Sequence, residues 1–243
     1  MKPLLTLLFF TSLACAQNNI TEQKITNNTA LKPENALAIY NNYNFANLWI
    51  QDRPTLGILG KNHQRLKIKI LSVKQDINNL NKYSITGKYA IKGKIYNFTG
   101  SIGIIKIREV KNLHFGVDNE YESHKIKSQG ILIAEYKFKE DSLQKNTGIF
   151  KGKLYSKWYL SAKDEIKYDD IELFSDGYFN NAFIGTWQPN INAPKKIANW
   201  GDYRVPNAND DFDIGAGEFF PSKKYISQGW EDYSPTEKEN WWK

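Results

Sequence analysis

The chain has 243 residues, a formal net charge of +7, one cysteine and one methionine. With a single thiol it cannot form an internal disulfide, so its stability must come from an ordinary apolar core, which a chain of this length can supply. The sequence also lacks the signatures of several enzyme classes: its three histidines form no His-Glu-x-x-His motif, and it contains neither a Gly-x-Ser-x-Gly elbow nor a phosphate-binding loop.

Residues 1–16 have the three parts of a secretory signal peptide. Lys2 supplies a positive start, an apolar run follows from residue 4 to residue 14, and Ala14-Cys15-Ala16 is a small-x-small cleavage site. The run is shorter than the ~20 residues that span a bilayer, and no later segment approaches that length. We therefore predict cleavage before Gln17, no transmembrane segment, and a periplasmic or secreted bacterial protein.

The same residues allow a second interpretation. Ser12-Leu13-Ala14-Cys15 is similar to a bacterial lipoprotein signal, with Ser in the place of the usual Leu. Processing at this site would attach a lipid anchor at Cys15 and give an outer-membrane lipoprotein. Cleavage after Ala16 remains the favoured alternative.

Residues 17–45 predict a polar lead and a short helix. Residues 17–30 are rich in Asn, Thr and Gln and have no periodicity, which is typical of a disordered segment. Pro33 suits the first turn of a helix that runs to about Tyr40, where an Asn-rich stretch ends it.

Residues 46–187 predict an antiparallel β domain. Apolar residues alternate with lysines, as in Leu66-Lys67-Ile68-Lys69-Ile70, which is typical of strands with one buried face. Similar strands are expected around 88–95, 102–110, 130–138, 150–160, 166–174 and 178–187. Their short connections favour antiparallel pairing, and so large a sheet is expected to close into a barrel or pack as a sandwich. We favour an all-β barrel, because glycines fall inside the strands.

Residues 188–243 predict an irregular extension packed on the β domain. Prolines interrupt this stretch repeatedly, while tryptophans at 200, 230, 241 and 242 offer large areas to bury. A further strand is expected at 212–220. From residue 199 onward acids outnumber bases, so the extension could lie on the basic body of the protein.

A four-residue pattern occurs twice in the extension, and this internal echo is the first candidate ligand site. Trp200-Gly-Asp202-Tyr203 and Trp230-Glu-Asp232-Tyr233 share the pattern Trp-x-Asp-Tyr. Aromatic rings beside carboxylates suit sugars, because rings stack on C–H faces and carboxylates accept hydroxyl hydrogen bonds. The alternative, which the sequence favours, is that the aromatic residues anchor the extension and each Asp bonds a turn.

The acidic loop at 207–218 is the candidate metal site. Its oxygen-bearing residues Asn209, Asp211, Asp213 and Glu218 could bind calcium on a flexible loop. The EF-hand pattern is not met, since Ile214 stands where its glycine would fall. The alternative is a solvated loop without a cofactor that leads into the strand at 212–220.

Two further sets of charged residues could carry a function. The lysines at 67–69, 88–94 and 151–157 would form one basic face if their strands were neighbours, and such a face could meet anionic glycans or lipid headgroups. Among carboxylates, Asp170 and Glu172 would share one strand face, and Glu135 is expected to point inward with Ile131 and Ile133.

Phe183-Ile184-Gly185-Thr186-Trp187 resembles the Gly-x-Trp motif of lipocalin-like barrels. In that family the motif opens the barrel, whereas here it lies near the end of the strand-rich region. The likeness covers five residues and implies no membership and no ligand pocket.

These features together predict an exported β-rich binding or interaction protein of the bacterial envelope, which recognises a glycan, a small ligand or another envelope protein rather than nucleic acid. One alternative is a hydrolase that acts on envelope polysaccharide with the carboxylates named above. Another is a structural or inhibitory envelope protein with no small ligand.

Overall fold

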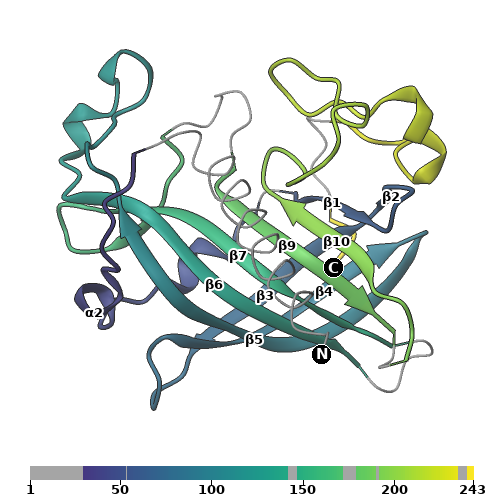
Figure 1. Ribbon diagram of the computed structural model, residues 1–243, viewed down its shortest axis with the longest axis horizontal. Helices are drawn as coiled ribbons and strands as arrows, with labels where there is room; N and C mark the ends of the chain where they lie inside the picture. The colour runs from purple at the N-terminus through teal and green to yellow at the C-terminus, as the bar shows by residue number, and fades with distance from the viewer. Residues whose placement is uncertain (1–29, 53, 142–146, 172–178, 190–191, 235–239) are drawn as a thin grey trace, which may run out of the picture.

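The computed structural model describes residues 30–52, 54–141, 147–171, 179–189, 192–234 and 240–243. Ten strands form one antiparallel sheet, in the order β2-β1-β10-β9-β7-β6-β5-β4-β3, with β8 paired to β7 (Figure 1). The predicted all-β class is confirmed. The signal peptide, the lipid-anchor alternative and the polar lead up to residue 29 lie outside the described residues.

The strands are β1 (Leu56–Leu59), β2 (Gln64–Arg65), β3 (Lys67–Gln75), β4 (Lys82–Ile91), β5 (Lys94–Glu109), β6 (Ser128–Glu140), β7 (Ile149–Leu160), β8 (Ile166–Tyr168), β9 (Asn181–Gln188) and β10 (Lys196–Gly201). The helical segments are short: α2 (Leu37–Tyr40), η1 (Ala46–Leu48), η2 (Val117–Asn119), η3 (Glu122–His124) and η4 (Lys223–Gln228). None of the described helices is long and apolar enough to cross a bilayer.

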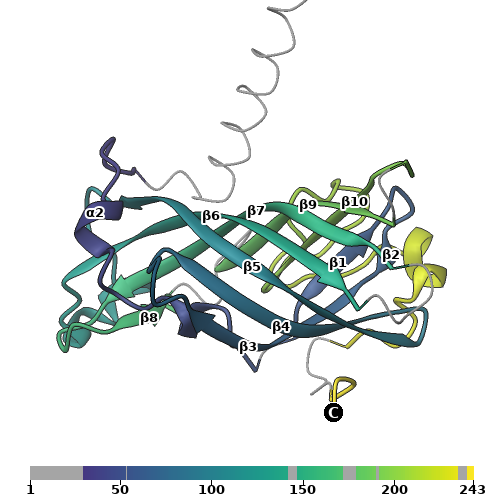
Figure 2. The same ribbon diagram turned by 90° about the horizontal axis from the view of Figure 1, so that it is seen from below.

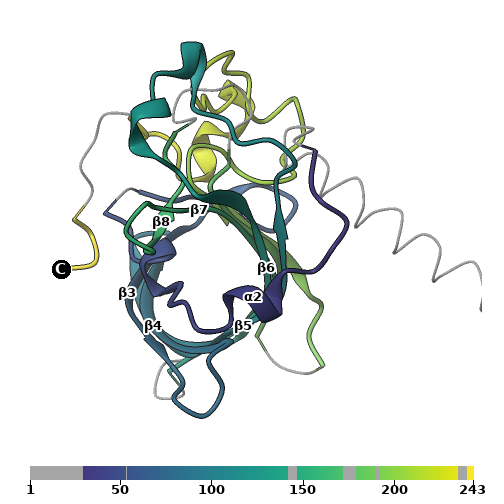
Figure 3. The same cartoon turned by 90° about the vertical axis from the view of Figure 1, so that its left-hand side faces the viewer.

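The sheet curls strongly, so the fold is barrel-like (Figures 2 and 3). Its two ends meet because β2 runs directly into β3. The amide of Leu66, between these strands, donates to the carbonyl of Gly57 in β1 at 2.8 Å, and the Thr55 hydroxyl donates to the carbonyl of Ile68 in β3 at 2.8 Å. Strands β2 and β3 are thus two parts of one interrupted strand. Because β1 pairs with β2, it also lies beside the start of β3.

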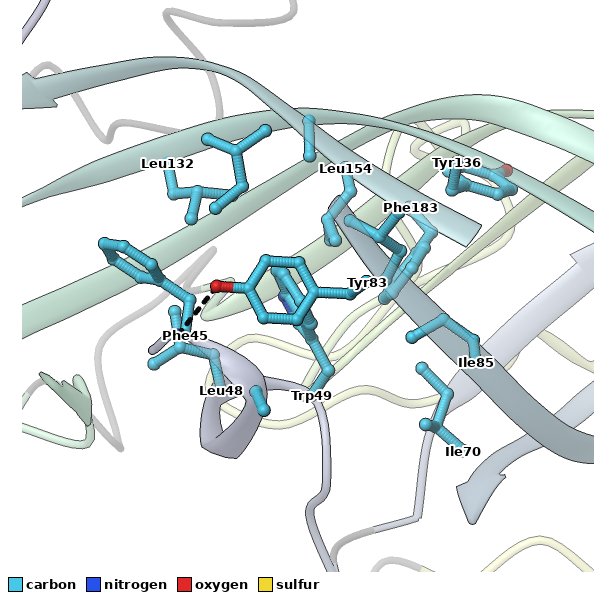
Figure 4. Close-up of a cluster of buried hydrophobic side chains, with 14 of the residues drawn as sticks. Phe45, Leu48, Trp49, Ile70, Tyr83, Ile85, Leu132, Tyr136, Leu154 and Phe183 are labelled. Carbon is cyan, nitrogen blue, oxygen red and sulfur yellow. Dashed lines mark hydrogen bonds between the residues drawn. The ribbon is translucent and has the colours of Figure 1, made fainter. Parts of the chain in front are cut away.

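Aromatic and aliphatic side chains fill the inside of the curled sheet. Inward positions alternate with outward ones along each strand, so that Tyr136 and Phe138 of β6 are buried while Lys137 between them is exposed. Figure 4 shows Tyr83 at the centre of this core, where its hydroxyl accepts a hydrogen bond of 3.1 Å from the amide of Phe45. The interior is thus a packed core.

One end of the barrel is covered by the segment that carries α2 and η1 (Figure 3). Tyr40 and Phe45 pack edge-on against Trp158 of β7, with ring centroids 4.7 and 6.0 Å away. The Tyr40 hydroxyl donates to Glu109 and accepts a hydrogen bond from the Ser128 hydroxyl. Burial and the bond to Glu109 raise the pKa of Tyr40 to about 12.

The helix in this segment is shorter than predicted. It begins at Leu37, because residues before it bond to β5 instead: the Ala36 amide donates to the carbonyl of Ile107, and the Asn35 side chain accepts from the Ile107 amide. Pro33 therefore precedes the helix and is not in its first turn.

The extension is not irregular throughout, because its residues 196–201 form β10 within the sheet. Its later part, from Val205 to Trp230, packs outside the barrel on the outer face of β1 and β2. A second apolar cluster forms there between Leu56 and Ile58 of β1 and residues of the extension, among them Phe212, Phe219 and Trp230. The Trp230 indole donates to the carbonyl of His63 at 2.9 Å, which ties the extension to the β1–β2 turn.

One predicted strand is wrong, and another is shorter than predicted. No strand forms at 212–220, because the Arg204 guanidinium binds Asp213 and the carbonyls of Gly215, Ala216 and Gly217 and folds this stretch into a compact loop. At 166–174, β8 ends at Tyr168, where the amide of Asp170 turns back to the Tyr168 carbonyl. Residues 172–178 lie outside the described residues.

Candidate functional site

A groove on the outer face of the sheet is the main candidate site. Its volume is about 650 Å³, which lies in the range of ligand-binding clefts. It crosses β4, β5, β6, β7 and β9 beside the β3–β4 hairpin. We call it the lysine groove, because Lys82, Lys137, Lys151 and Lys153 line it.

Strand pairing decides how these lysines sit relative to one another. Lys137 of β6 is directly opposite Lys151 of β7, and Lys153 is opposite Glu135. Side chains in such positions have Cβ atoms about 5 Å apart, and like charges there destabilise a sheet. Within the described part of the chain, no carboxylate lies within ion-pair distance of Lys137 or Lys151. An anion between the two ammonium groups would relieve their repulsion.

Neutral polar groups complete the groove. The amide side chains of Asn79 and Asn81 and the hydroxyls of Ser101 and Thr186 border it. Glycines 103 and 152 leave parts of its floor as bare backbone. The arrangement offers positive charge, hydrogen-bond donors and acceptors, and room for a ligand that lies across several strands.

Three of the strands that carry the groove approach one another closely on the inner face of the sheet. Tyr136, Gly152 and Gly185 follow one another across β6, β7 and β9. A Cβ at Gly185 would lie 2.2 Å from the Lys151 carbonyl and 2.5 Å from the Tyr136 hydroxyl, so only glycine fits. Among the described residues this buried hydroxyl has no hydrogen-bond partner, and burial raises the pKa of Tyr136 well above its ordinary value.

The two Trp-x-Asp-Tyr segments do not come together. Trp200 is fully buried inside the barrel, stacked on Phe183 at 4.8 Å between ring centroids. Trp230 is buried outside the barrel, in the cluster on β1. Both indoles therefore pack in cores, as in the structural interpretation of the echo.

The other residues of the echo also make internal contacts. Asp202 is buried and accepts hydrogen bonds from the Tyr168 hydroxyl at 2.7 Å and from the Asn181 amide and side chain. Asp232 pairs with Arg65 at 2.8 Å. Tyr233 packs on Trp230 and Phe219, and Tyr203 has a left-handed backbone with φ of 66°. Asp232 thus holds a tail segment to β2.

Two carboxylates of the acidic loop form ion pairs with basic side chains of the protein itself. Asp211 binds Lys224 at 2.6 Å and Asp213 binds Arg204 at 2.6 Å. Asn209 donates to Asp211, and Glu218 is exposed. Within the described residues, no three His, Cys, Asp or Glu side chains gather as a metal site would require. Calcium binding by Asn209, Asp211, Asp213 and Glu218 stays a prediction.

The carboxylates considered for hydrolysis are dispersed. Glu135 is exposed on the outer face, because Ile131 and Ile133 beside it form a separate outer cluster rather than part of the interior. Its predicted inward orientation is wrong. Asp170 is exposed after β8, and Glu172 lies outside the described residues. Glu135 is the single carboxylate among the described residues that line the groove.

A carboxylate that the sequence analysis missed is buried at the end of the barrel opposite α2. Glu140 is 2% exposed and accepts hydrogen bonds from the Tyr89 hydroxyl at 2.9 Å, the Gly148 amide at 2.7 Å and the Trp187 indole. Trp187 is the tryptophan of the Gly-x-Trp motif. The three donors fix the Glu140 carboxylate in place, so its role at this end of the barrel is structural.

The predicted basic face is divided in two. Lys69 and Lys88 are covered by the end of the chain: the Lys69 ammonium lies 4.5 Å from the Trp242 ring centroid, and Lys88 donates to the Trp242 carbonyl. Lys151 and Lys153 line the groove instead. Lys137 was missed, although its alternation with Tyr136 and Phe138 is a signal that places it on the same outer face.

A small cavity borders the interior of the barrel. A cavity of about 30 Å³ lies between residues that include Trp49, Phe183, Trp200 and Asp202. That is the size of about one water molecule. No protein-family model matches this chain, and no curated protein or solved structure matches it either.

Proposed function

We propose that the protein is an exported binding protein of the bacterial envelope that holds an anionic polysaccharide in the lysine groove. One observation carries the proposal: Lys137 and Lys151 lie directly opposite each other in an open groove, and no carboxylate of the described chain neutralises them. Exposed lysines placed in this way attract polyanions and bind them more weakly as salt rises.

The shape of the groove favours a polymer over a single sugar. It crosses five neighbouring strands, which corresponds to about 19 Å at the usual strand spacing. Carboxylate or sulfate groups along a chain would meet the lysines in turn, while Asn79, Asn81, Ser101 and Thr186 would bond to the sugar hydroxyls. Glu135 beside Lys153 would disfavour a charged group at that position and so set the register.

The compartment is part of the proposal. The features of residues 1–16 support export and cleavage before Gln17, and export would bring the groove to where envelope polysaccharides occur. Lipid attachment at Cys15 is the alternative and would present the same groove at a membrane. The hydrolase alternative has less support, since a two-carboxylate mechanism needs a partner for Glu135 in the groove.

The test is titration calorimetry of the processed protein, residues 17–243, with polygalacturonic acid and with uncharged dextran. We expect saturable binding of polygalacturonic acid alone, weakened by salt. The double variant Lys137→Gln/Lys151→Gln should bind about tenfold more weakly, because each exposed charge contributes up to ~1 kcal/mol.

The matched control is Lys92→Gln/Lys94→Gln. It removes the same charge from exposed positions at the β4–β5 turn, outside the groove, and should bind as the wild type does. Equal weakening by both double variants would show nonspecific attraction to net charge and contradict the proposal. So would an absence of binding to any acidic polysaccharide.

A further inference from the structure

The turn between β3 and β4 exposes apolar side chains at its tip. Ile77 is 86% exposed and Leu80 is 39% exposed. In Figures 1 and 3 this hairpin projects below the barrel. Turns usually carry Gly, Asn, Asp or Ser at such positions, so a protruding isoleucine needs an explanation.

Hydrogen bonds on both sides of Ile77 hold the hairpin in this conformation. The amide of Asp76 donates to the Lys82 carbonyl at 2.8 Å, and the amide of Asn78 donates to the Asp76 carboxylate at 2.8 Å. The Gln75 side chain donates to the Leu80 carbonyl at 2.8 Å. These bonds fix the backbone on both sides of Ile77 and present its side chain to solvent.

Neighbouring elements add to the same surface. The amide of Ile104 donates to the carbonyl of Asn81 at 2.8 Å, which places the hairpin beside Ile105, itself 44% exposed at a bulge in β5. Two exposed lysines flank the tip, Lys74 at the end of β3 and Lys82 at the start of β4. The tip therefore combines protruding aliphatic groups with two lysines, against the single carboxylate of Asp76.

We propose that this hairpin tip docks the protein on an anionic lipid bilayer. Ile77, Leu80 and Ile105 would enter the boundary between headgroups and acyl chains, while Lys74 and Lys82 would lie at the level of the phosphates. A narrow, convex tip suits a fluid bilayer, whereas a protein partner would need a broad complementary face. Lys82 and Ile105 also line the lysine groove, but Ile77 does not, so the inference can be tested at Ile77 whatever the groove binds.

The test is sedimentation of residues 17–243 with large vesicles, either of phosphatidylcholine or of phosphatidylcholine mixed with phosphatidylglycerol. We expect binding to the mixed vesicles. Ile77→Asn should lower the partition coefficient about tenfold or more, since it removes the burial of one isoleucine side chain. Lys74→Gln/Lys82→Gln should weaken binding to the mixed vesicles and leave the level on phosphatidylcholine unchanged.

The matched control is Ile214→Asn, because Ile214 is 57% exposed on the extension and should not contact the bilayer. Equal binding of wild type and Ile77→Asn, or no binding of the wild type to mixed vesicles, would overturn the proposal. Loss of self-association in Ile77→Asn, seen by sedimentation velocity without vesicles, would reassign the tip to a protein contact.

Polysaccharide binding and vesicle binding are measured independently of each other. Vesicle binding without polysaccharide binding would refute the function proposed for the groove and leave membrane docking in place. Polysaccharide binding that is unchanged in Ile77→Asn, together with no vesicle binding, would do the reverse.

Discussion

At the scale of single residues, the buried hydroxyl of Tyr136 has no hydrogen-bond partner among the described residues. A buried polar group without a partner loses its bonds to water and gains none. Tyr136→Phe should therefore leave the free energy of unfolding unchanged or raise it by about 1 kcal/mol, measured by urea denaturation.

Tyr83→Phe is the matched comparison. The Tyr83 hydroxyl accepts hydrogen bonds from the Phe45 amide and the Gln75 side chain, both at 3.1 Å. Its removal should lower the free energy of unfolding by about 1–2 kcal/mol. If Tyr136→Phe destabilised the protein as much as Tyr83→Phe does, the unpartnered state of Tyr136 would be refuted.

Glu109 is a second residue with a measurable signature, because it joins the α2 segment to the barrel. Burial acts to raise its pKa, but the hydrogen bonds from Lys32 and Tyr40 outweigh burial and lower the pKa below the ordinary 4.5. A lowered folded-state pKa adds stability above the unfolded-state pKa, and this stability is lost as pH falls through the folded-state value.

Glu109→Gln should therefore be less stable than the wild type, by on the order of 1 kcal/mol after solvent screening, above about pH 5. The difference should shrink as pH falls below 4.5, the ordinary carboxyl value. Urea denaturation of both proteins from pH 3 to 7 measures it. A difference that did not depend on pH would contradict this account of Glu109.

At the scale of elements, β7 and β9 approach closely at their paired glycines, Gly152 and Gly185. Because a Cβ at Gly185 would overlap the Lys151 carbonyl, Gly185→Ala should lower the free energy of unfolding by about 2–3 kcal/mol. The control is Gly103→Ala in β5, where a Cβ would meet nothing within 4 Å. Similar stability of the two variants would argue against the close contact.

The elements also show why some predictions succeed. Alternation of lysine with apolar residues depends on the period of a strand, so it correctly predicts β3, β6 and β7 from local sequence alone. The loop at 212–220 has a similar local pattern, but Arg204 bonds its carbonyls from outside the segment. A long-range contact of this kind leaves no trace in the periodicity.

For the molecule as a whole, the barrel-like class followed from the short connections between strands and the glycines within them, whereas the candidate site did not follow from the sequence. Lys137 and Lys151 come into register only because β6 pairs with β7 along its full length. The aromatic residues at 200 and 230 looked alike in sequence, but one faces the barrel interior and the other the outer cluster. Local composition does not show whether a side chain faces the inside or the outside of the barrel.

The pairing of β1 with β10 has a consequence for how the chain reaches this state. Strands β3 to β7 can form in sequence as neighbouring hairpins, and Leu56–Leu59 can pair with β2, but the other edge of Leu56–Leu59 must wait for residues 198–201. Contacts so distant in sequence carry a large loop-closure entropy and form slowly. A chain that emerges N-terminus first would therefore hold an unpaired edge strand until its last strand is free, and the final step of folding would protect that edge from aggregation.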